Sequence, residues 1–295
     1  RAKRLLVARD YQETISYSFI SPEMAQLLSP QEQQITLANP ISADMAVMRG
    51  TLLPGLIQAM QHNIARQQSR IRLFESGLRF SKTDELTQVP MFAGLIAGQL
   101  EEEQWSQNKR VVDFYDIKGD LEAVLGLTAD PDSFSFAAAE SAVLHPGQSA
   151  QIMRNGVAVG WVGMLHPELE KKLALGMHTY VFEVSLEALN DGKLPAFEPL
   201  SRFPSIRRDL ALVMPETLAF IEIEKCVRKA SHAIVKDIRL FDVYTGDNID
   251  SGLKSLALSL ILQDSSKTLT DEEVDSASNA ILSALSTELN VELRD

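Results

Sequence analysis

Arginines at positions 202, 207 and 208 form a basic run in the last third of the chain. Planar guanidinium groups can stack on unpaired RNA bases and can also pair with phosphates. The chain carries a net charge of −12, however, which excludes non-specific coating of nucleic acid by summed Lys and Arg charge. Residues 1–80 hold 9 basic and 6 acidic groups, residues 81–200 hold 8 and 18, and residues 201–295 hold 11 and 16. Any contact with RNA must therefore come from a local patch.

Several other groups could ligate a metal or act in catalysis, but each has a simpler structural explanation. Three consecutive carboxylates at 101–103 converge poorly on one cation, and helix capping and solvation explain the aspartates at 113, 116 and 120. Two His-Pro pairs, at 145 and 166, lack a third ligand at metal-site spacing. The single cysteine, Cys226, excludes an internal disulfide and is expected to be an inert buried thiol.

Apolar spacing predicts the elements of the first 195 residues. Residues 1–9 form a basic helix, and residues 53–66 form an amphipathic one. A helix also begins at Ser21-Pro22, with serine as cap and proline at the first helical position. Two further helices begin at residue 113, where the helix is closed by Gly126, and at Pro167. Strands are expected at 13–20, 71–80, 91–98, 149–154, 157–165 and 179–186.

The connections in this half carry their own signals. Asn155-Gly156 between two alternating runs predicts a hairpin with a two-residue type I′ turn. Residues 81–90 are expected to be a polar loop, and Trp105 is expected to anchor the acidic segment around it. No apolar run approaches the roughly 20 residues that span a bilayer. The first residue is Arg, so we expect a fragment of a longer chain.

The remaining residues predict a second, compact unit after a proline-punctuated linker. Residues 208–214 alternate as a strand, residues 220–230 form an amphipathic helix, and residues 235–244 and 253–262 are strands joined by the loop 245–252. A long helix at 270–289 and a short strand at 291–294 complete a βαββαβ, ferredoxin-like order. The chain as a whole is therefore expected to be α+β.

Three motifs of the second unit are specific. The runs Ser201-Arg-Phe-Pro-Ser-Ile-Arg-Arg-Asp209, Phe241-Asp-Val-Tyr244 and Lys254-Ser-Leu-Ala257 resemble the ferredoxin-like anticodon-binding domain that ends the bacterial phenylalanyl-tRNA synthetase beta subunit. Asn39-Pro-Ile-Ser42, Met48-Arg49, Phe74-Glu-Ser-Gly77 and residues 113–120 resemble the class II synthetase-like core that precedes it. The resemblance implies an antiparallel synthetase-like core at 1–195, a linker at 196–204 and the anticodon-binding domain at 201–295.

The same resemblance implies the function and the partners. This chain would be the non-catalytic C-terminal portion of a phenylalanine–tRNA ligase beta subunit in the cytoplasm, with two alpha and two beta subunits, phenylalanine tRNA as ligand and no membrane association. The whole enzyme would use ATP and magnesium, and this portion would bind neither, because the Gly-x-Gly-x-Glu-Arg run of a working class II site is missing. The helix at 53–66 is a possible contact with the alpha subunit. The candidate tRNA-binding residues are Arg202, Arg207, Arg208, Arg239, Tyr244 and Lys254.

Alternatives remain open at this point. Arg70, Arg72 and Arg79 could hold an ATP phosphate, although exposed strand arginines are the plainer interpretation. Ferredoxin-like units also bind amino acids, so the loop 245–252 could serve a small-molecule-sensing module. A ligase active by itself is a further alternative, which phenylalanine-dependent pyrophosphate exchange would reveal.

Overall fold

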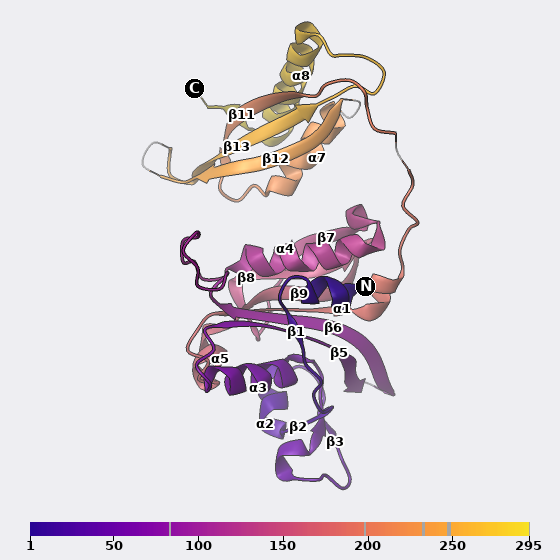
Figure 1. Ribbon diagram of the computed structural model, residues 1–295, viewed down its shortest axis with the longest axis vertical. Helices are drawn as coiled ribbons and strands as arrows, with labels where there is room; N and C mark the ends of the chain where they lie inside the picture. Colours follow the sequence, from indigo (N-terminus) through magenta and orange to yellow (C-terminus); the bar gives the residue numbers. More distant parts are fainter. Residues whose placement is uncertain (83, 198, 232–233, 247–248, 295) are drawn as a thin grey trace. The chain divides into compact units, whose positions relative to one another are not determined.

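The computed structural model describes residues 1–82, 84–197, 199–231, 234–246 and 249–294 of the chain. The chain divides into two compact units, Arg1–Pro195 and Ala196–Asp295, each with its own core. The mixed α+β class is confirmed. The helices and strands of the first unit (Figure 1) are α1 Ala2–Val7, β1 Gln12–Glu13, β2 Phe19–Ile20, α2 Pro22–Leu28, β3 Ile35–Thr36, β4 Val47–Met48, α3 Leu53–Ile64, β5 Arg70–Lys82, β6 Leu86–Gly98, α4 Phe114–Leu125, β7 Phe134–Ala138, β8 Leu144–Arg154, β9 Val157–Leu165, α5 Pro167–Lys172, β10 Thr179–Ser185 and α6 Leu186–Asn190.

A seven-stranded sheet in the order β1-β5-β6-β10-β9-β8-β7 organises the first unit. Its neighbouring strands pair antiparallel except β1 with β5. Successive side chains of β6 point to opposite faces, so Leu95 packs with α3 and α5 while Ile96 packs with α1 and α4. Figure 1 shows these helices on the two sides of the sheet. Both faces of the central strands are therefore covered.

The expected hairpin and helix starts of this unit are present. Asn155 and Gly156 both have positive φ, 49° and 79°, as a type I′ turn requires. Asp113 caps α4 in a capping box with Asp116, and the α4 helix ends at Gly126 as predicted. Ser21 accepts a hydrogen bond from the amide of Met24 at the start of α2. These features depend only on residues close in sequence.

Several expectations for this unit are wrong. Residues 13–20 are not one strand, because the backbone leaves β5 after Thr14 so that Ser16 can bond Glu75 and Arg49. The 81–90 loop is shorter, since β5 extends to Lys82 and β6 begins at Leu86. Trp105 does not anchor the acidic segment to the described residues of the first unit, because it is 97% exposed.

The second unit has the βαββαβ order predicted for it. Its elements (Figure 1) are β11 Ile206–Pro215, α7 Phe220–Ala230, β12 Val235–Tyr244, β13 Leu253–Leu262, α8 Asp271–Leu289 and β14 Glu292–Leu293. The sheet order is β12-β13-β11-β14, with antiparallel neighbours throughout. Thr270 and Glu273 form a capping box at the start of α8. The loop 245–252 includes residues 247–248, which lie outside the described residues.

Among the described residues, no helix is long and apolar enough to cross a membrane.

Candidate nucleic-acid interface

The sheet of the second unit has one face packed against helices. Leu212 of β11 and Leu256, Leu258 and Leu260 of β13 form its core with Val274 and other residues of α7 and α8. Because side chains alternate along a strand, the residues between them project to the opposite face. Small residues make the middle of that face, which we call the open face: Ala211, Ser255, Ala257 and Ser259.

An arginine lies against an aromatic ring on this face. The guanidinium carbon of Arg207 is 5.6 Å from the centroid of Phe241, across β13 from it. Phe241 reaches this face because an irregularity in the β12–β13 pairing falls between Leu240 and Asp242. The Phe241 side chain is 54% exposed, so its ring is accessible to a ligand.

A second pair spans the same face. Arg294 follows β14, and its amide donates to the carbonyl of Ala211, which brings its side chain to the open face. Its guanidinium carbon is 5.3 Å from the ring centroid of Tyr244 on β12. Arg294 and Phe241 were not among the sequence candidates. Phe241 lies inside the Phe-Asp-Val-Tyr motif, but only strand pairing at the chain's end reveals Arg294.

Carboxylates hold the arginines in place. Arg207 donates to Asp209 through Nε at 2.8 Å and Nη2 at 3.1 Å, and Ser259 donates to the same carboxylate at 2.7 Å. The hydrogen bond from Arg207, followed by that from Ser259, lowers the pKa of Asp209. Arg239 donates to Asp237 at 2.7 Å. Two arginines of the open face, Arg207 and Arg239, are therefore ion-paired, and the face is not a purely basic surface.

The six sequence candidates do not form one surface. Arg207, Arg239 and Tyr244 contribute to the open face. Arg208 points to the helix side and bonds Asp275 of α8 at 3.3 Å. Lys254 donates to the carbonyls of Glu216 and Leu218, at 2.8 and 2.7 Å, and so stabilises the turn before α7. The sixth, Arg202, is exposed and precedes β11.

The strand arginines of the first unit have different surroundings. Arg72 is mostly buried and donates to Asp120 at 2.9 Å, and Arg70 donates to Asp10 at 3.0 Å. Asp120 also accepts from Arg9 and Tyr11, at 2.7 Å each. The interpretation of Arg70 and Arg72 as exposed strand arginines is wrong, and so is solvation as the explanation of Asp120. Long-range ion pairing accounts for both.

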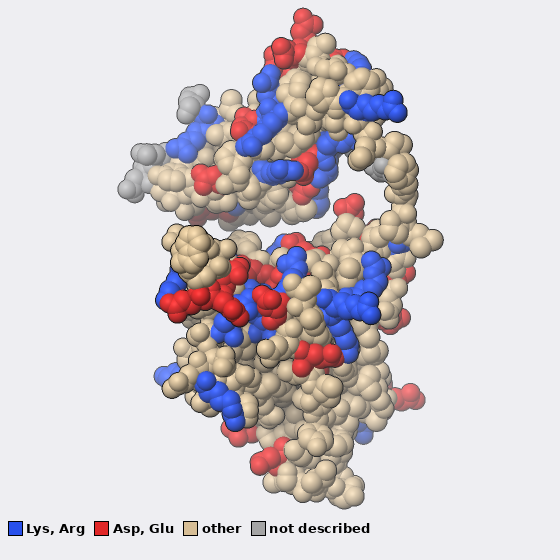
Figure 2. All heavy atoms as spheres, viewed as in Figure 1, with Lys and Arg blue, Asp and Glu red and all other residues tan. Residues whose placement is uncertain are grey.

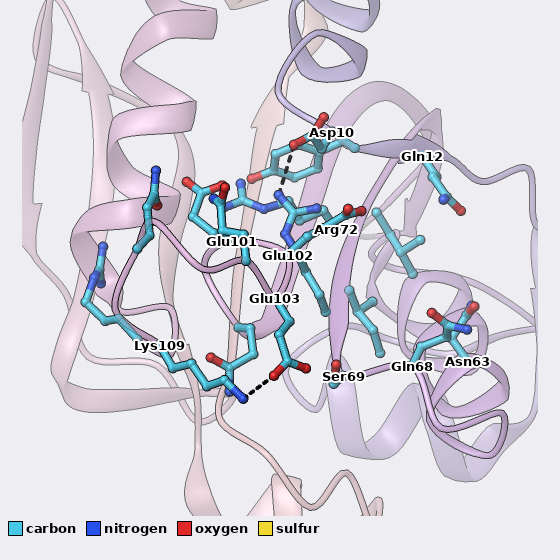
Figure 3. Close-up of a pocket in the computed structure, with 18 of the residues that line it drawn as sticks. Asp10, Gln12, Asn63, Gln68, Ser69, Arg72, Glu101, Glu102, Glu103 and Lys109 are labelled. Carbon is cyan, nitrogen blue, oxygen red and sulfur yellow. Dashed lines mark hydrogen bonds and ion pairs between the residues drawn. The ribbon is translucent and has the colours of Figure 1, made fainter.

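A polar cavity of about 720 Å³ lies beside these arginines. Figure 3 shows Asp10 and Gln12 on one side, Arg72 within it, and Glu101, Glu102, Glu103 and Lys109 on the other. Because both guanidinium groups already pair with carboxylates, they are poorly suited to hold a phosphate. Among the residues that the structure describes, no group of three or more His, Cys, Asp or Glu side chains is placed to hold a metal.

Comparison with known families agrees with this division of the chain. Residues 1–186 match the model of the phenylalanyl tRNA synthetase beta chain CLM domain, and residues 201–294 match the ferredoxin-fold anticodon binding domain. The chain thus combines part of an aminoacyl-tRNA synthetase with an anticodon-binding type of domain. It belongs to the phenylalanyl-tRNA synthetase beta chain family.

Full-length relatives support the assignment. The phenylalanine–tRNA ligase beta subunit of Pseudomonas fluorescens Pf-5 is 50% identical over 99% of this chain and 37% of its own length. Those of Colwellia psychrerythraea and Nitrosococcus oceani are 48% and 49% identical over 99% and 100% of this chain, and 37% and 38% of their own lengths. The chain thus spans well under half of these relatives. A pyrrolysyl-tRNA synthetase structure from Desulfitobacterium hafniense is a distant match, with TM-score 0.49 and 14% identity over 64% of this chain and 65% of that one.

Proposed function

We propose that this chain is the non-catalytic C-terminal portion of a phenylalanine–tRNA ligase beta subunit and that the open face of its second unit binds the anticodon loop of phenylalanine tRNA. The observation that carries the proposal is the pair of arginine–aromatic contacts, Arg207 with Phe241 and Arg294 with Tyr244, over a floor of small residues. RNA loops expose unstacked bases, which stack on aromatic rings and guanidinium planes. Ser255 and Ser259 of this floor are only 4% and 2% exposed, so a base would stack on the arginine and aromatic side chains that lie on this face.

The charges of the open face favour bases over the phosphate backbone. Asp209 and Asp237 accompany Arg207 and Arg239, so phosphates meet as much repulsion as attraction. Carboxylates can instead accept hydrogen bonds from the amino groups of bases. The interface is therefore expected to read bases of the loop, with a modest salt dependence for each contact.

The first unit is proposed to be a scaffold for the alpha subunit in an assembly of two alpha and two beta subunits in the cytoplasm. ATP and magnesium would act in the alpha subunit. The apolar side chains of α3 already pack inside the unit, so they are not available to a partner. The exposed residues of α3 include Gln58 and His62. An alpha subunit meeting α3 would therefore contact a polar surface.

The proposal is tested by titrating the chain with three tRNAs at two salt concentrations. These are phenylalanine tRNA, the same tRNA with a substituted anticodon, and an unrelated tRNA. We expect preference for the native anticodon. Tyr244→Ala should weaken that binding by about tenfold to a hundredfold, since a stacked base contributes roughly 1–3 kcal/mol.

Adjacent arginines provide a matched control. Arg207→Ala should weaken binding of the native anticodon, whereas Arg208→Ala should leave it nearly unchanged, because Arg208 points away from the open face. Equal losses from both variants would show that the contact is a diffuse electrostatic one. Equal, weak and salt-sensitive binding of all three tRNAs would refute base recognition by this unit.

A further inference from the structure

A tryptophan of the first unit, Trp105, is almost fully exposed. Residues 100–110, here called the finger loop, connect β6 to α4. Trp105 lies midway along this loop, and its side chain is 97% exposed. Tryptophan is among the residues that contribute most to protein interfaces when buried there. An indole exposed to this degree has a large apolar surface available to a partner.

The base of the finger loop is firmly held. The amide of Leu100 donates to the carbonyl of Arg110 at 2.8 Å, and the amide of Val112 donates to that of Gly98 at 2.9 Å. Arg70 also donates to the carbonyl of Leu100 at 3.1 Å. These bonds fix the point where the loop leaves the sheet. The two ends of the loop that carries Trp105 are thus fixed, which lowers the entropy lost on binding.

The chain does not bury this indole in its own cavity. The polar cavity of about 720 Å³ is lined by Gln104, Gln107 and other finger-loop residues, but Trp105 is not among them. Figure 3 shows the carboxylates and Lys109 that the loop contributes to this wall. The polar character of these walls explains why the apolar ring is not accommodated there.

The charge around Trp105 indicates the kind of partner. Three carboxylates, at 101–103, precede it, and they are exposed. Lys109 pairs with Glu103 at 2.6 Å, and Arg110 pairs with Asp116 at 2.7 Å, so both cations of the loop are neutralised. Acidic side chains gather beside α4 on the face that Figure 2 shows. An RNA backbone would be repelled here, whereas a basic protein surface would be attracted.

We propose that the finger loop docks onto the alpha subunit, at an indole-sized apolar pocket bordered by lysine or arginine side chains. This proposal rests on the subunit assembly proposed above, and the finger loop would be one of the contacts that stabilise that assembly. Trp105 fills the pocket, and Glu101 and Glu102 meet the basic border. This contact is independent of the open face of the second unit.

The test is hydroxyl-radical footprinting of the full-length beta-type subunit, alone, with the alpha subunit, and with tRNA. We expect the oxidation rate of Trp105 to fall sharply when the alpha subunit binds and to stay unchanged with tRNA. Tyr17, which is 67% exposed between β1 and β2, serves as the internal control and should remain oxidisable. Trp105→Ser should weaken subunit association by about tenfold or more, and Tyr17→Ser should not.

Charge reversal tests the second half of the proposal. Glu101→Lys with Glu102→Lys should weaken association, and the loss should shrink at high salt. Glu140→Lys, an exposed residue elsewhere in the unit, is the matched control. An unchanged oxidation rate of Trp105 in the assembled ligase would overturn the proposal, as would protection by tRNA alone. Loss of anticodon preference in the tRNA titration would not affect it.

Discussion

Strand arginines occur in both units, but their surroundings are opposite. The Arg72 side chain is 8% exposed and bonds a carboxylate that is itself buried. The Arg239 side chain is 69% exposed and pairs with an exposed Asp237. The first arginine is part of the unit's core, where an unpaired charge is costly. The second can leave its partner for a ligand at little cost.

The difference shows why residue type alone does not identify a binding site. Asp120 gathers Arg9, Tyr11 and Arg72, three residues far from it in the sequence, and thereby joins the segment between α1 and β1 to β5 and α4. On the open face, Arg207 meets an exposed aromatic ring instead. Burial and partner decide whether an arginine stabilises the fold or is available for recognition.

The strongest way to test this contrast is Asp120→Ala. The substitution leaves Arg72 buried without its carboxylate, so we expect the first unit to lose about 3–5 kcal/mol of unfolding free energy. Both tryptophans, Trp105 and Trp161, lie in this unit, so urea unfolding followed by tryptophan fluorescence reports on it. Glu122→Ala, an exposed ion-pair partner on the same helix, should cost no more than about 1 kcal/mol. Similar losses of unfolding free energy from both variants would show that the buried ion pair contributes no more to stability than an exposed one.

Features that neighbouring residues determine are predictable from the sequence. The Asn155-Gly156 turn and the Asp113 cap require only a few adjacent residues, and they were predicted. The 13–20 segment alternates like a strand, yet Ser16 turns inward to Glu75, a residue that no local pattern connects to it. Asp120 was missed for the same reason.

The candidate site shows the same limit. Its motifs identified Arg207 and Tyr244, which share the open face. The same motif contains Arg208, which strand alternation places on the other face. Arg294 was missed because its position beside Tyr244 depends on β14 pairing with β11 across the whole unit.

A smaller effect is expected from Tyr11, which with Arg72 and Asp120 forms what we call the buried cluster. Tyr11→Phe removes a hydrogen bond to the charged Asp120, which should cost about 1.5–3 kcal/mol near neutral pH. Burial, then the nearby charge of Asp120, raises the pKa of Tyr11 well above its ordinary value of 10.0. The folded chain therefore disfavours the phenolate. The stability that is fully present below the ordinary pKa of 10.0 is lost as the pH rises above that value, by about 1.4 kcal/mol per pH unit.

The measurement is urea unfolding of both proteins at several alkaline pH values. The wild-type protein should lose more stability with rising pH than Tyr11→Phe, because the variant lacks this ionisation. If both proteins lost stability in parallel, Tyr11 would ionise as freely in the folded chain as in the unfolded one. The buried cluster would then be more hydrated than its contacts indicate.

The smallest effect is expected for Arg239→Ala on the open face. Its ion pair with Asp237 is exposed on both sides, so its removal should change the unfolding free energy of the second unit by no more than about 0.5 kcal/mol. Both tryptophans lie in the first unit, so unfolding of the second is followed by far-UV circular dichroism at urea concentrations where the fluorescence is constant. If the same variant also weakened binding of the native anticodon, this arginine would serve recognition and not the fold. A loss of several kcal/mol would instead place Arg239 with Arg72 among the structural arginines and remove it from the proposed interface.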